Sequence, residues 1–421
     1  MNHTKLHEFF PMLPGNRVQA IIDPAALTRN YRALMAPVWA VSPHTYAIAV
    51  VKADAYGHGI LPVVTALLAA GCRSFAVACL EEAVALRTIL SKIAADRATD
   101  VLVLGYVDPQ HAALLSAYDI TVTLLSEDYA ERLQACAEQA EVTVRVHAAL
   151  DTGMNRIGYP AHSDTEIRDT VDALLRLRTE PRADGKGGLV LDGLFTHFAR
   201  ADEDYDAEMN TEDSMTLTQF SRYRRVLAGL TERGVRPRVC HVCNSAAAIR
   251  FPHALPEGCL DAVRLGISLY GYGVDTPRGA EDATAVSTAG IKPVMRLETV
   301  VTHVHTLLPG ETVGYGGTFS SDRPRTLATL SLGYADGWMR AFSGVSVTFH
   351  TREGDVTAPI VGRICMDQCM ADVTGLPVTA GTAVTLFGQT REQLESLAAH
   401  AHTIPYEILC LISARVPRVY P

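Results

Sequence analysis

From residue 46 to residue 270 the chain alternates between short, mostly apolar runs and longer segments in which apolar residues recur at helical spacing. The short runs predict buried strands of a parallel sheet, and the periodic segments predict helices that cover the sheet. The predicted strands are 46–51, 75–79, 101–104, 120–125, 142–150, 189–197, 238–243 and 262–270. The predicted helices that follow them are 60–70, 80–93, 109–118, 127–140, 164–178, 217–233 and 245–250.

Eight strands that alternate with helices over about 250 residues match the size of a closed (β/α)8 barrel. A doubly wound sheet is the alternative, but no Gly-x-Gly-x-x-Gly motif opens the first strand-to-helix turn. The fold class expected is therefore α/β, with an N-terminal TIM-like barrel. A strand at 18–23 and a helix at 24–35 precede the barrel strands, and the polar stretches 181–188 and 201–213 are expected to be surface loops.

Beyond Gly273 the pattern changes. Residues 274–290 are polar and predict a linker. Alternation of apolar and polar residues then predicts a mostly antiparallel β domain with one helix at 391–400. The alternating segments are 299–305, 326–332, 345–350 and 383–387. The predicted units are an N-terminal extension at 1–17, a barrel domain at 18–285 and a C-terminal β domain at 286–421.

The composition narrows the classes of function. Of the 421 residues, 48% are hydrophobic and 20% charged, which is typical of a globular protein with a large core. The formal net charge is -9 and no run of Lys and Arg occurs, so neither nucleic acid nor an anionic membrane is expected as a partner. The longest mostly apolar run, 60–70, is too short to span a bilayer. Residues 1–17 contain no apolar signal core, so the expected location is the cytoplasm.

The nine cysteines are scattered and often lie in apolar segments, which predicts reduced thiols rather than a disulfide framework. Cys240-His241-Val242-Cys243 has the spacing of a redox or zinc motif. Because no second pair lies nearby and the segment is a predicted strand, no metal site is expected.

Lys52 follows the first barrel strand directly and is the first candidate for chemistry. The carboxyl ends of barrel strands form the face where active sites lie, and partial burial there favours a neutral amine that can form a Schiff base. Only five of the 37 Lys and Arg residues are lysines, and arginine cannot replace an amine in such a bond. The alternative is a lysine whose stem is buried and whose charge reaches the surface.

Other polar residues also fall at or near the carboxyl ends of predicted strands. Arg156 follows the fifth strand, His197 ends the sixth, and Arg264 lies within the eighth. Asn244 and Ser245 follow the seventh strand and open a helix, and Gly266 and Ile267 follow Arg264. The loops after strands seven and eight form the usual phosphate site of this fold, and a helix amino terminus can bind the anion. Such a phosphate site beside a lysine after strand one suits pyridoxal phosphate.

Several of these residues also have a purely structural interpretation. His197 can be a hydrogen-bonded core histidine, Ser245 a helix cap, and Tyr315 a ring packed in the glycine-rich turn 313–317. Asp202 can be a solvated loop charge. Arg264 is harder to explain in this way, because a buried guanidinium needs a partner.

Taken together, these residues and their flanking motifs resemble the alanine racemase family of fold-type III pyridoxal-phosphate enzymes over nearly the whole chain, from Val18 to Tyr420. Nine matching segments follow in the order of the family, which is far more specific than any one of them. They are Ala49–Gly59, Asp151–Gly158, Thr196–Ala199, Asn244–Ala247, Val263–Ile267, Val313–Gly316, Gly333–Gly337, Gly362–Gln368 and Arg415–Arg418.

The resemblance implies a pyridoxal 5'-phosphate-dependent racemase that interconverts L- and D-alanine with two bases, Lys52 and Tyr315. Lys52 would also bind the cofactor covalently, and Tyr315 would come from the partner subunit of a head-to-tail homodimer. The remaining cofactor-binding residues implied are Tyr56, Arg156, His197, Asn244, Ser245, Arg264, Gly266 and Ile267. Of these, His197 would lie against the pyridine ring, Arg156 at its phenolic oxygen and Arg264 at its nitrogen.

The small amino-acid substrate would be bound by Arg156, by the backbone N–H of Met366 and by Tyr334. Asp202, Arg340 and Arg363, with Tyr334, would line the approach to the site.

Two positions depart from the family pattern. Many relatives have a lysine, carbamylated in some, at the position of Ala149, where it supports the arginine matched by Arg156. We expect a chloride or ordered water beside Arg156 instead. Many relatives have a tyrosine at the position of Ala414, over the substrate side of the pocket. The smaller side chain makes a serine or broad-specificity racemase the alternative to an alanine racemase.

Two other functions are less favoured. Decarboxylases of basic amino acids also join a barrel to a β domain, but they place a carboxylate rather than an arginine at the pyridine nitrogen. Non-catalytic pyridoxal-phosphate carriers have the barrel but lack the β domain that contains Tyr315.

Overall fold

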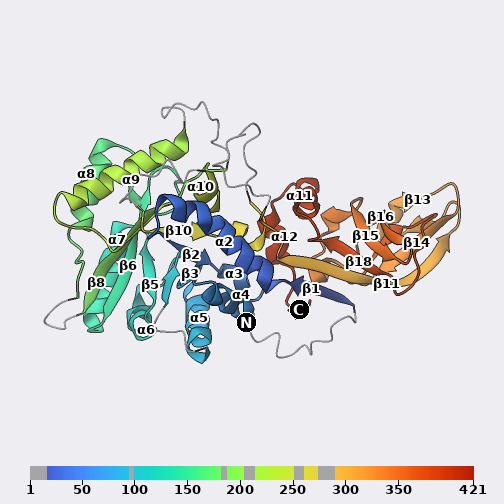
Figure 1. The fold of residues 1–421 in the computed structure, drawn as a ribbon, viewed down its shortest axis with the longest axis horizontal. Coiled ribbons are helices and arrows are strands. Elements are labelled where there is room, and N and C mark those ends of the chain that lie inside the picture. The colour runs from blue at the N-terminus through green and yellow to red at the C-terminus, as the bar shows by residue number, and fades with distance from the viewer. Residues whose placement is uncertain (1–16, 94–98, 182–186, 203–213, 251–259, 274–289) are drawn as a thin grey trace.

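The chain folds into a parallel barrel and an antiparallel β domain that lie end to end (Figure 1). The structure is a computed structural model and describes residues 17–93, 99–181, 187–202, 214–250, 260–273 and 290–421. The predicted extension, both predicted loops and the predicted linker therefore lie wholly or mostly outside the described residues.

Within the described ranges, eight parallel strands form the barrel, as the sequence pattern predicts. They are β2 (Tyr46–Val50), β3 (Ser74–Val77), β4 (Asp100–Val103), β5 (Thr121–Leu124), β6 (Thr143–Asp151), β8 (Gly188–Thr196), β9 (Val239–His241) and β10 (Ala262–Leu265). Strands adjacent in this order are paired, and the pairing of β10 with β2 closes the ring. The two-residue strand β7 (Tyr159–Pro160) extends the sheet beside the end of β6.

Helices surround the barrel because each buries one apolar face, such as Ala83, Leu86 and Leu90 of α5. They are α2 (Pro24–Val41), α4 (Ile60–Ala69), α5 (Leu80–Lys92), α6 (Ala112–Ala117), α7 (Glu127–Gln139), α8 (Asp164–Leu174), α9 (Met215–Thr231) and α10 (Ser245–Arg250). The predicted eighth strand is shorter than expected, since the chain turns at Gly266 into the 3-10 helix η2 (Ile267–Tyr270).

The first strand, β1 (Val18–Ile22), belongs to the C-terminal sheet. It pairs antiparallel with β11 (Met295–Leu307) and parallel with β19 (Arg418–Val419). Although residues 18–22 were predicted to be part of the barrel domain, this strand is therefore part of the C-terminal sheet. Its alternating burial explains why: Val18, Ala20 and Ile22 are buried and the residues between them are half-buried, whereas a barrel strand is buried on both faces.

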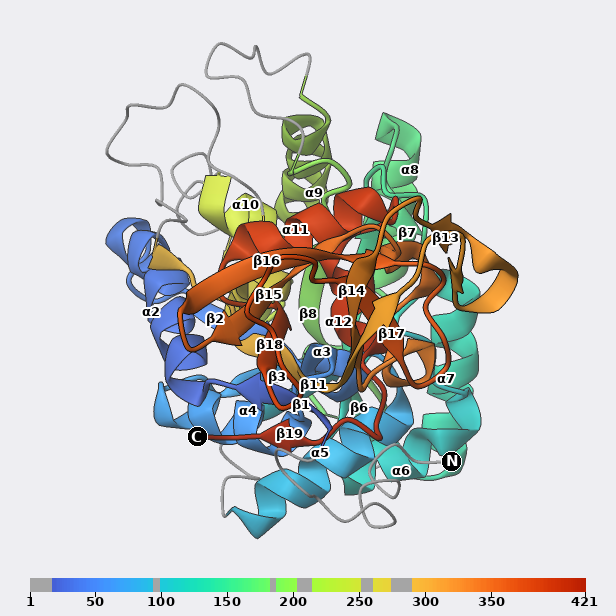
Figure 2. The same ribbon diagram turned by 90° about the vertical axis from the view of Figure 1, so that its right-hand side faces the viewer.

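The C-terminal domain contains a second ring of six antiparallel strands among the described residues. These are β11, β14 (Arg325–Leu330), β15 (Ser346–Thr351), β16 (Gly354–Val361), β17 (Cys369–Asp372) and β18 (Ala383–Phe387). The long strand β11 closes the ring, because it pairs with β18 near its start and with β14 near its end. The predicted antiparallel domain is thus confirmed, and Figure 2 shows it in front of the barrel.

Two helices and a short hairpin of this domain bear on the site. The helices α11 (Arg391–His400) and α12 (Pro405–Leu411) follow β18, and α12 contacts the turn after β2. The short hairpin of β12 (Thr312–Val313) and β13 (Phe319–Ser320) lies at the end of the domain that points away from the barrel (Figure 1). In the parts of the chain that the structure describes, no helix is both long and apolar enough to cross a membrane.

Candidate active site

Lys52 lies at the carboxyl end of β2, as predicted, but the backbone that follows it is unusual. Residues Ala53 to Tyr56 all have φ angles of 53–55°, so α3 (Lys52–Tyr56) contains a left-handed turn. For residues with a Cβ this conformation costs roughly 1–2 kcal/mol each. The turn therefore persists only because surrounding groups hold it.

Two carboxylates hold the left-handed turn from the barrel side. Glu82 accepts the Ala53 N–H through Oε1 at 2.6 Å and the Ala78 N–H through Oε2 at 2.7 Å. Asp54 accepts the Ile60 N–H through Oδ1 at 2.8 Å, which links the turn to the start of α4. Lys52 thus follows a buried strand and precedes a turn that is fixed at several points.

The C-terminal end of the chain holds the same turn from the other side. The Arg418 Nε donates to the Gly57 carbonyl at 2.9 Å, and the Tyr420 hydroxyl donates to the His58 carbonyl at 3.1 Å. A Cβ at Gly57 would lie only 2.4 Å from the Leu409 carbonyl oxygen, so α12 approaches the turn closely. The position of the Lys52 amine therefore depends on both domains.

A small polar cradle lies where the left-handed turn meets the start of η2. The Gly266 N–H donates to Ser245 Oγ at 2.8 Å, and a Cβ at Gly266 would lie 2.9 Å from the Tyr56 hydroxyl oxygen. Only glycine leaves this space open. Three of the residues predicted to bind phosphate thus converge, and the buried Ile267 follows directly.

Asn244 has a different role from its neighbour. Its Oδ1 accepts the Ala247 N–H at 3.0 Å and its Nδ2 donates to the Phe198 carbonyl at 3.3 Å. Asn244, rather than Ser245, therefore caps α10, and both ends of its side chain are engaged within the protein. Its predicted contact with the cofactor stays a prediction.

Arg264 is buried at the centre of this end of the barrel. Its Nη1 donates to His241 Nδ1 at 2.7 Å, and its Nη2 donates to the Thr196 and Val242 carbonyls at 2.7 and 3.0 Å. Its guanidinium also lies over the Phe195 ring, 5.1 Å from the centroid. Burial lowers the pKa of Arg264 to about 10, which still leaves the group cationic at neutral pH.

His197 lies close to the three positively charged residues of the site, Arg264, Arg156 and Lys52. Its Nδ1 lies 3.4 Å from Arg264 Nη2. Burial, and after it the positive charges of Arg264, Arg156 and Lys52, together lower the pKa of His197 to about 3. The imidazole is therefore neutral, and the four residues predicted to surround the cofactor ring lie in one place.

Arg156 is exposed on a loop that Asp151 shapes. The Asp151 Oδ1 accepts the backbone N–H groups of Gly153 and Asn155 at 3.1 and 2.9 Å. Ala149, two residues before Asp151, is buried within β6. Within the described part of the chain Arg156 has no ion-pair partner, which agrees with the departure noted at Ala149.

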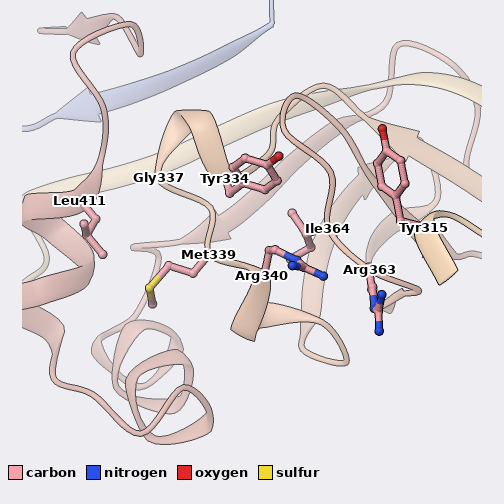
Figure 3. A pocket seen from close by; sticks show the side chains of 8 residues that line it. All are labelled: Tyr315, Tyr334, Gly337, Met339, Arg340, Arg363, Ile364 and Leu411. Carbon is pink, nitrogen blue, oxygen red and sulfur yellow. The ribbon is translucent and has the colours of Figure 1, made fainter. Parts of the chain in front are cut away.

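A second group of predicted residues lies on the C-terminal domain, around a pocket of about 650 Å³ (Figure 3). The predicted residues Tyr315, Tyr334, Arg340 and Arg363 line it, and Leu411 of α12 lies at its other side. Tyr315 is 71% exposed, the most of any large hydrophobic residue described. The pocket thus presents two tyrosine hydroxyls and two guanidinium groups.

Met366 lies beside this pocket and is 52% exposed. Its carbonyl accepts the Ala335 N–H at 3.0 Å, and a Cβ at Gly333 would lie 2.4 Å from the same oxygen. The buried Asp336 holds this turn, because its carboxylate accepts hydrogen bonds from Arg17, Arg415 and the Gly333 N–H. Despite its burial, these partners lower the pKa of Asp336 below its usual value.

The two groups of residues are separate within one chain. All eight residues that line the pocket lie between 315 and 411, and none belongs to a barrel strand. The β12–β13 hairpin, which contains Tyr315 in its turn, points away from the barrel (Figure 1). Asp202 instead lies on the barrel side, where its charge adds to the burial that raises the pKa of Tyr406 on α12 to about 12.

Sequence reasoning missed the residues that support the site. Glu82 was not predicted to hold the turn after Lys52, and α12 was not predicted. The histidines of apolar strands, His147 and His241, were not predicted to contact each other. The one available signal was a charged or polar residue inside an apolar strand, which must find a partner when buried.

Fold and site together define a class of enzyme in which a (β/α)8 barrel with an amine at its mouth is joined to a C-terminal β domain. The family model described as alanine racemase, N-terminal domain, matches residues 22–274, and that described as alanine racemase, C-terminal domain, matches 294–420. The chain belongs to the alanine racemase family and is an isomerase.

Relatives and solved structures agree with this assignment. The chain is 36% identical over 404 residues to an alanine racemase of Desulfovibrio desulfuricans, covering 96% of this chain and 98% of the relative. The alanine racemase of E. faecalis has a similar structure, with a TM-score of 0.79 and 32% identity, covering 98% of this chain and 100% of the other. A histidine racemase from Leuconostoc mesenteroides is also similar, with a TM-score of 0.76, 26% identity and coverage of 97% and 99%.

Proposed function

We propose that this chain is a pyridoxal 5'-phosphate-dependent alanine racemase whose two bases are Lys52 and Tyr315 from two subunits. The observation that carries the proposal is the barrel mouth, where Lys52, His197 and Arg264 lie beside the cradle of Tyr56, Ser245 and Gly266. Relatives named alanine racemase support the choice of alanine.

The residues present fit the proposed cofactor. The open space at Gly266, bounded by two hydroxyl groups and one backbone N–H, suits a phosphate. The neutral His197 can lie against a pyridine ring without adding charge, and Arg156 can donate to a phenolic oxygen. When bound, pyridoxal phosphate supplies an electron sink that spreads the negative charge left by removal of an α-proton.

Arg264 would set the strength of that sink. A guanidinium holds its protons far more tightly than a pyridinium does, so the ring nitrogen would accept a hydrogen bond without becoming protonated. A weaker sink favours return of the proton over loss of carbon dioxide or transfer of the amino group. This is the physical basis for preferring a racemase to a decarboxylase.

Racemisation needs one base on each face of the reacting carbon. The Lys52 amine would move a proton on one face, and the Tyr315 hydroxyl would move it on the other. Because Tyr315 is exposed on a hairpin that points away from its own barrel, we propose that it enters the barrel mouth of a partner in a head-to-tail homodimer. Met366 and Arg156 would bind the substrate carboxylate, and Asp202, Tyr334, Arg340 and Arg363 would line the approach.

Serine or broad-specificity racemisation is the second candidate. Ala414 follows α12 and is small and half-buried, so a larger substrate side chain is less hindered there. The similarity to a histidine racemase supports the view that this fold accepts other amino acids. We also propose that a chloride or ordered water supports Arg156, and an experimental density map with neither beside its guanidinium would contradict this.

The test is a racemisation screen across the common L-amino acids with added pyridoxal phosphate. We expect D-alanine to form fastest, and no racemisation of any amino acid would overturn the proposal. Lys52→Ala should abolish both turnover and the visible absorption of the lysine-bound cofactor, whereas Lys92→Ala, at the end of α5, should keep both. Retained visible absorption in the Lys52→Ala protein would refute the covalent link.

A further inference from the structure

A line of four buried side chains runs from Arg264 to Asp192 across four neighbouring strands of the barrel. The Arg264 Nη1 lies 2.7 Å from His241 Nδ1, and His241 Nε2 lies 2.9 Å from His147 Nδ1. His147 Nε2 in turn lies 3.6 Å from Asp192 Oδ2. All four residues are buried, and they come from four strands, β10, β9, β6 and β8.

The direction of every proton in this line follows from Arg264. A guanidinium only donates hydrogen bonds, so His241 Nδ1 must be an acceptor without a proton. A neutral His241 then carries its proton on Nε2 and donates it to His147 Nδ1. His147 must likewise carry its proton on Nε2, which faces the Asp192 carboxylate.

The charges agree with this arrangement. Burial lowers the pKa of both His147 and His241, which keeps them neutral. Although Asp192 is itself buried, Arg238 and His147 hold its pKa below the usual value. Asp192 also accepts from Arg238 Nε at 2.8 Å and from its Nη2 at 2.7 Å. Among the described residues Arg264 touches no carboxylate, and the carboxylate at the far end of the line, Asp192, is paired with Arg238.

The surrounding residues leave the two rings little freedom. The Phe195 ring stacks on His241 with centroids 4.8 Å apart. A Cβ at Gly193 would lie 2.5 Å from ring atoms of His147, so only glycine leaves space for that imidazole. The barrel interior is thus shaped around this line rather than filled with apolar side chains.

We propose that His147 and Asp192 are positioning residues for racemisation, which fix the tautomer of His241 and through it the orientation of Arg264. This inference rests on the proposed function, in which Arg264 faces the pyridine nitrogen. With His241 Nδ1 held as an acceptor, Arg264 Nη1 is bound on that side, while Nη2 is held by the Thr196 and Val242 carbonyls and lies 3.4 Å from His197 Nδ1. Without His147, the buried His241 Nε2–H has no acceptor, and the ring turns or changes tautomer.

The central experiment compares His147→Leu with His147→Gln. Leucine fills much of the space but accepts no hydrogen bond. Glutamine offers a carbonyl to His241 and an amide N–H to Asp192, so it should rescue the effect. Arg233→Gln is the control, because it removes an exposed ion pair between outer helices, to Asp172 at 3.2 Å.

The first measurement uses the histidine nitrogen NMR signals of protein without cofactor, so it does not depend on catalysis. In the native chain and in Arg233→Gln, we expect His147 and His241 to be single, neutral Nε2–H tautomers. In His147→Leu, His241 should show mixed tautomers or ring positions, and His147→Gln should restore one. An unchanged His241 signal in the folded leucine variant would overturn the positioning role.

The second measurement uses enzyme with cofactor. We expect kcat of His147→Leu to fall about 10- to 100-fold with KM within about twofold, because a misplaced Arg264 impairs the reaction more than substrate binding. Glutamine should recover most of the loss. A lower melting temperature with unchanged kcat would mean that the line only stabilises the barrel and would also overturn the proposal.

Asp192→Asn keeps the test decisive if the leucine variant does not fold. It removes the negative charge of Asp192 but leaves a carbonyl for His147, and we expect a smaller loss of kcat in the same direction, absent from Arg233→Gln. An unchanged kcat in folded Asp192→Asn would contradict the proposal. If the native chain racemises nothing, the proposed function fails, while the tautomer measurement still decides the positioning inference.

Discussion

Lys52 and Tyr315 differ sharply in their surroundings within one chain. Lys52 follows a buried strand and lies near the charged Arg156 and Arg264 and the neutral His197, whereas Tyr315 is 71% exposed on a separate domain. In the proposed mechanism these two bases work on opposite faces of the substrate, so neither can occupy the position of the other. Their separate environments also allow one base to be removed without disturbing the other.

Tyr315→Phe removes the hydroxyl and should impair the two directions of racemisation unequally. Loss of a positioned base typically costs 10²–10⁴-fold in rate. We expect proton abstraction from one alanine enantiomer to fall by about that factor and from the other by much less, measured as single-turnover loss of α-deuterium. Tyr118→Phe, on the barrel surface, is the control. Equal, mild losses for both enantiomers would argue against two bases.

Ala414→Tyr adds a ring to the segment after α12 and should narrow the substrate range. A pocket that gains or loses small apolar contacts changes discrimination by about 1–3 kcal/mol, which is roughly 5- to 150-fold. We expect the ratio of kcat/KM for alanine to that for serine to rise within this range. The exposed Ala135→Tyr on α7 tests for an unspecific effect of the added ring. An unchanged ratio would mean that position 414 does not select the substrate.

At the scale of elements, the left-handed turn after β2 combines strain with support. Four residues with a Cβ hold positive φ angles there, and Glu82, Arg418 and Tyr420 hold the turn from two domains. A loop free of strain could be built with fewer contacts. The many contacts indicate that the position of the Lys52 backbone is more important than the ease of forming this turn.

Ala53→Gly should test this strain directly. Glycine adopts positive φ without the Cβ clash, which relieves roughly 1–2 kcal/mol. It also makes the unfolded chain more flexible, which costs about 0.4–1 kcal/mol. We therefore expect the free energy of unfolding to stay equal or to rise by up to about 1.6 kcal/mol. Ala135→Gly, in the right-handed helix α7, should instead lower it by about 0.5–1 kcal/mol.

Both variants should be unfolded with denaturant at the same protein concentration, because an oligomer is stabilised by its own concentration. Equal losses for Ala53→Gly and Ala135→Gly would contradict the view that the turn is strained.

The barrel strands were predictable from the sequence because buried parallel strands are short and apolar and the helices between them are periodic. Residues directly after strands, such as Lys52 and His197, were predictable for the same reason. The left-handed turn was not, because its backbone is determined by Glu82 and Arg418, which lie far away in sequence. β1 was assigned to the barrel because a five-residue strand does not reveal which sheet it joins.

At the scale of the molecule, the two groups of site residues face different directions. The barrel mouth presents the Lys52 amine and the polar cradle at Gly266. The C-terminal domain presents tyrosine hydroxyls and guanidinium groups around a separate pocket. Neither group is sufficient for a two-base reaction. In the proposed head-to-tail dimer, the barrel mouth of each chain faces the C-terminal pocket of the other chain. This arrangement gives two identical sites related by twofold symmetry.

Mixing two inactive variants tests this arrangement without a structure of the dimer. Lys52→Ala lacks one base and Tyr315→Phe the other, so each homodimer has two damaged sites. In a mixed dimer one site receives both mutations and the other receives none. Random mixing of equal amounts should therefore restore roughly a quarter of the native racemase activity, since half of the dimers are mixed and each has one of two sites intact.

The exchange of subunits must be allowed to occur, for example by mixing the unfolded chains and refolding them with the cofactor. Each variant refolded alone, and the two mixed after refolding without exchange, are the controls. If Lys52 and Tyr315 of one chain formed the site together, every site in the mixture would carry one mutation, and activity would not exceed that of the separate variants. Recovery of activity only after exchange thus requires that the two bases come from different chains.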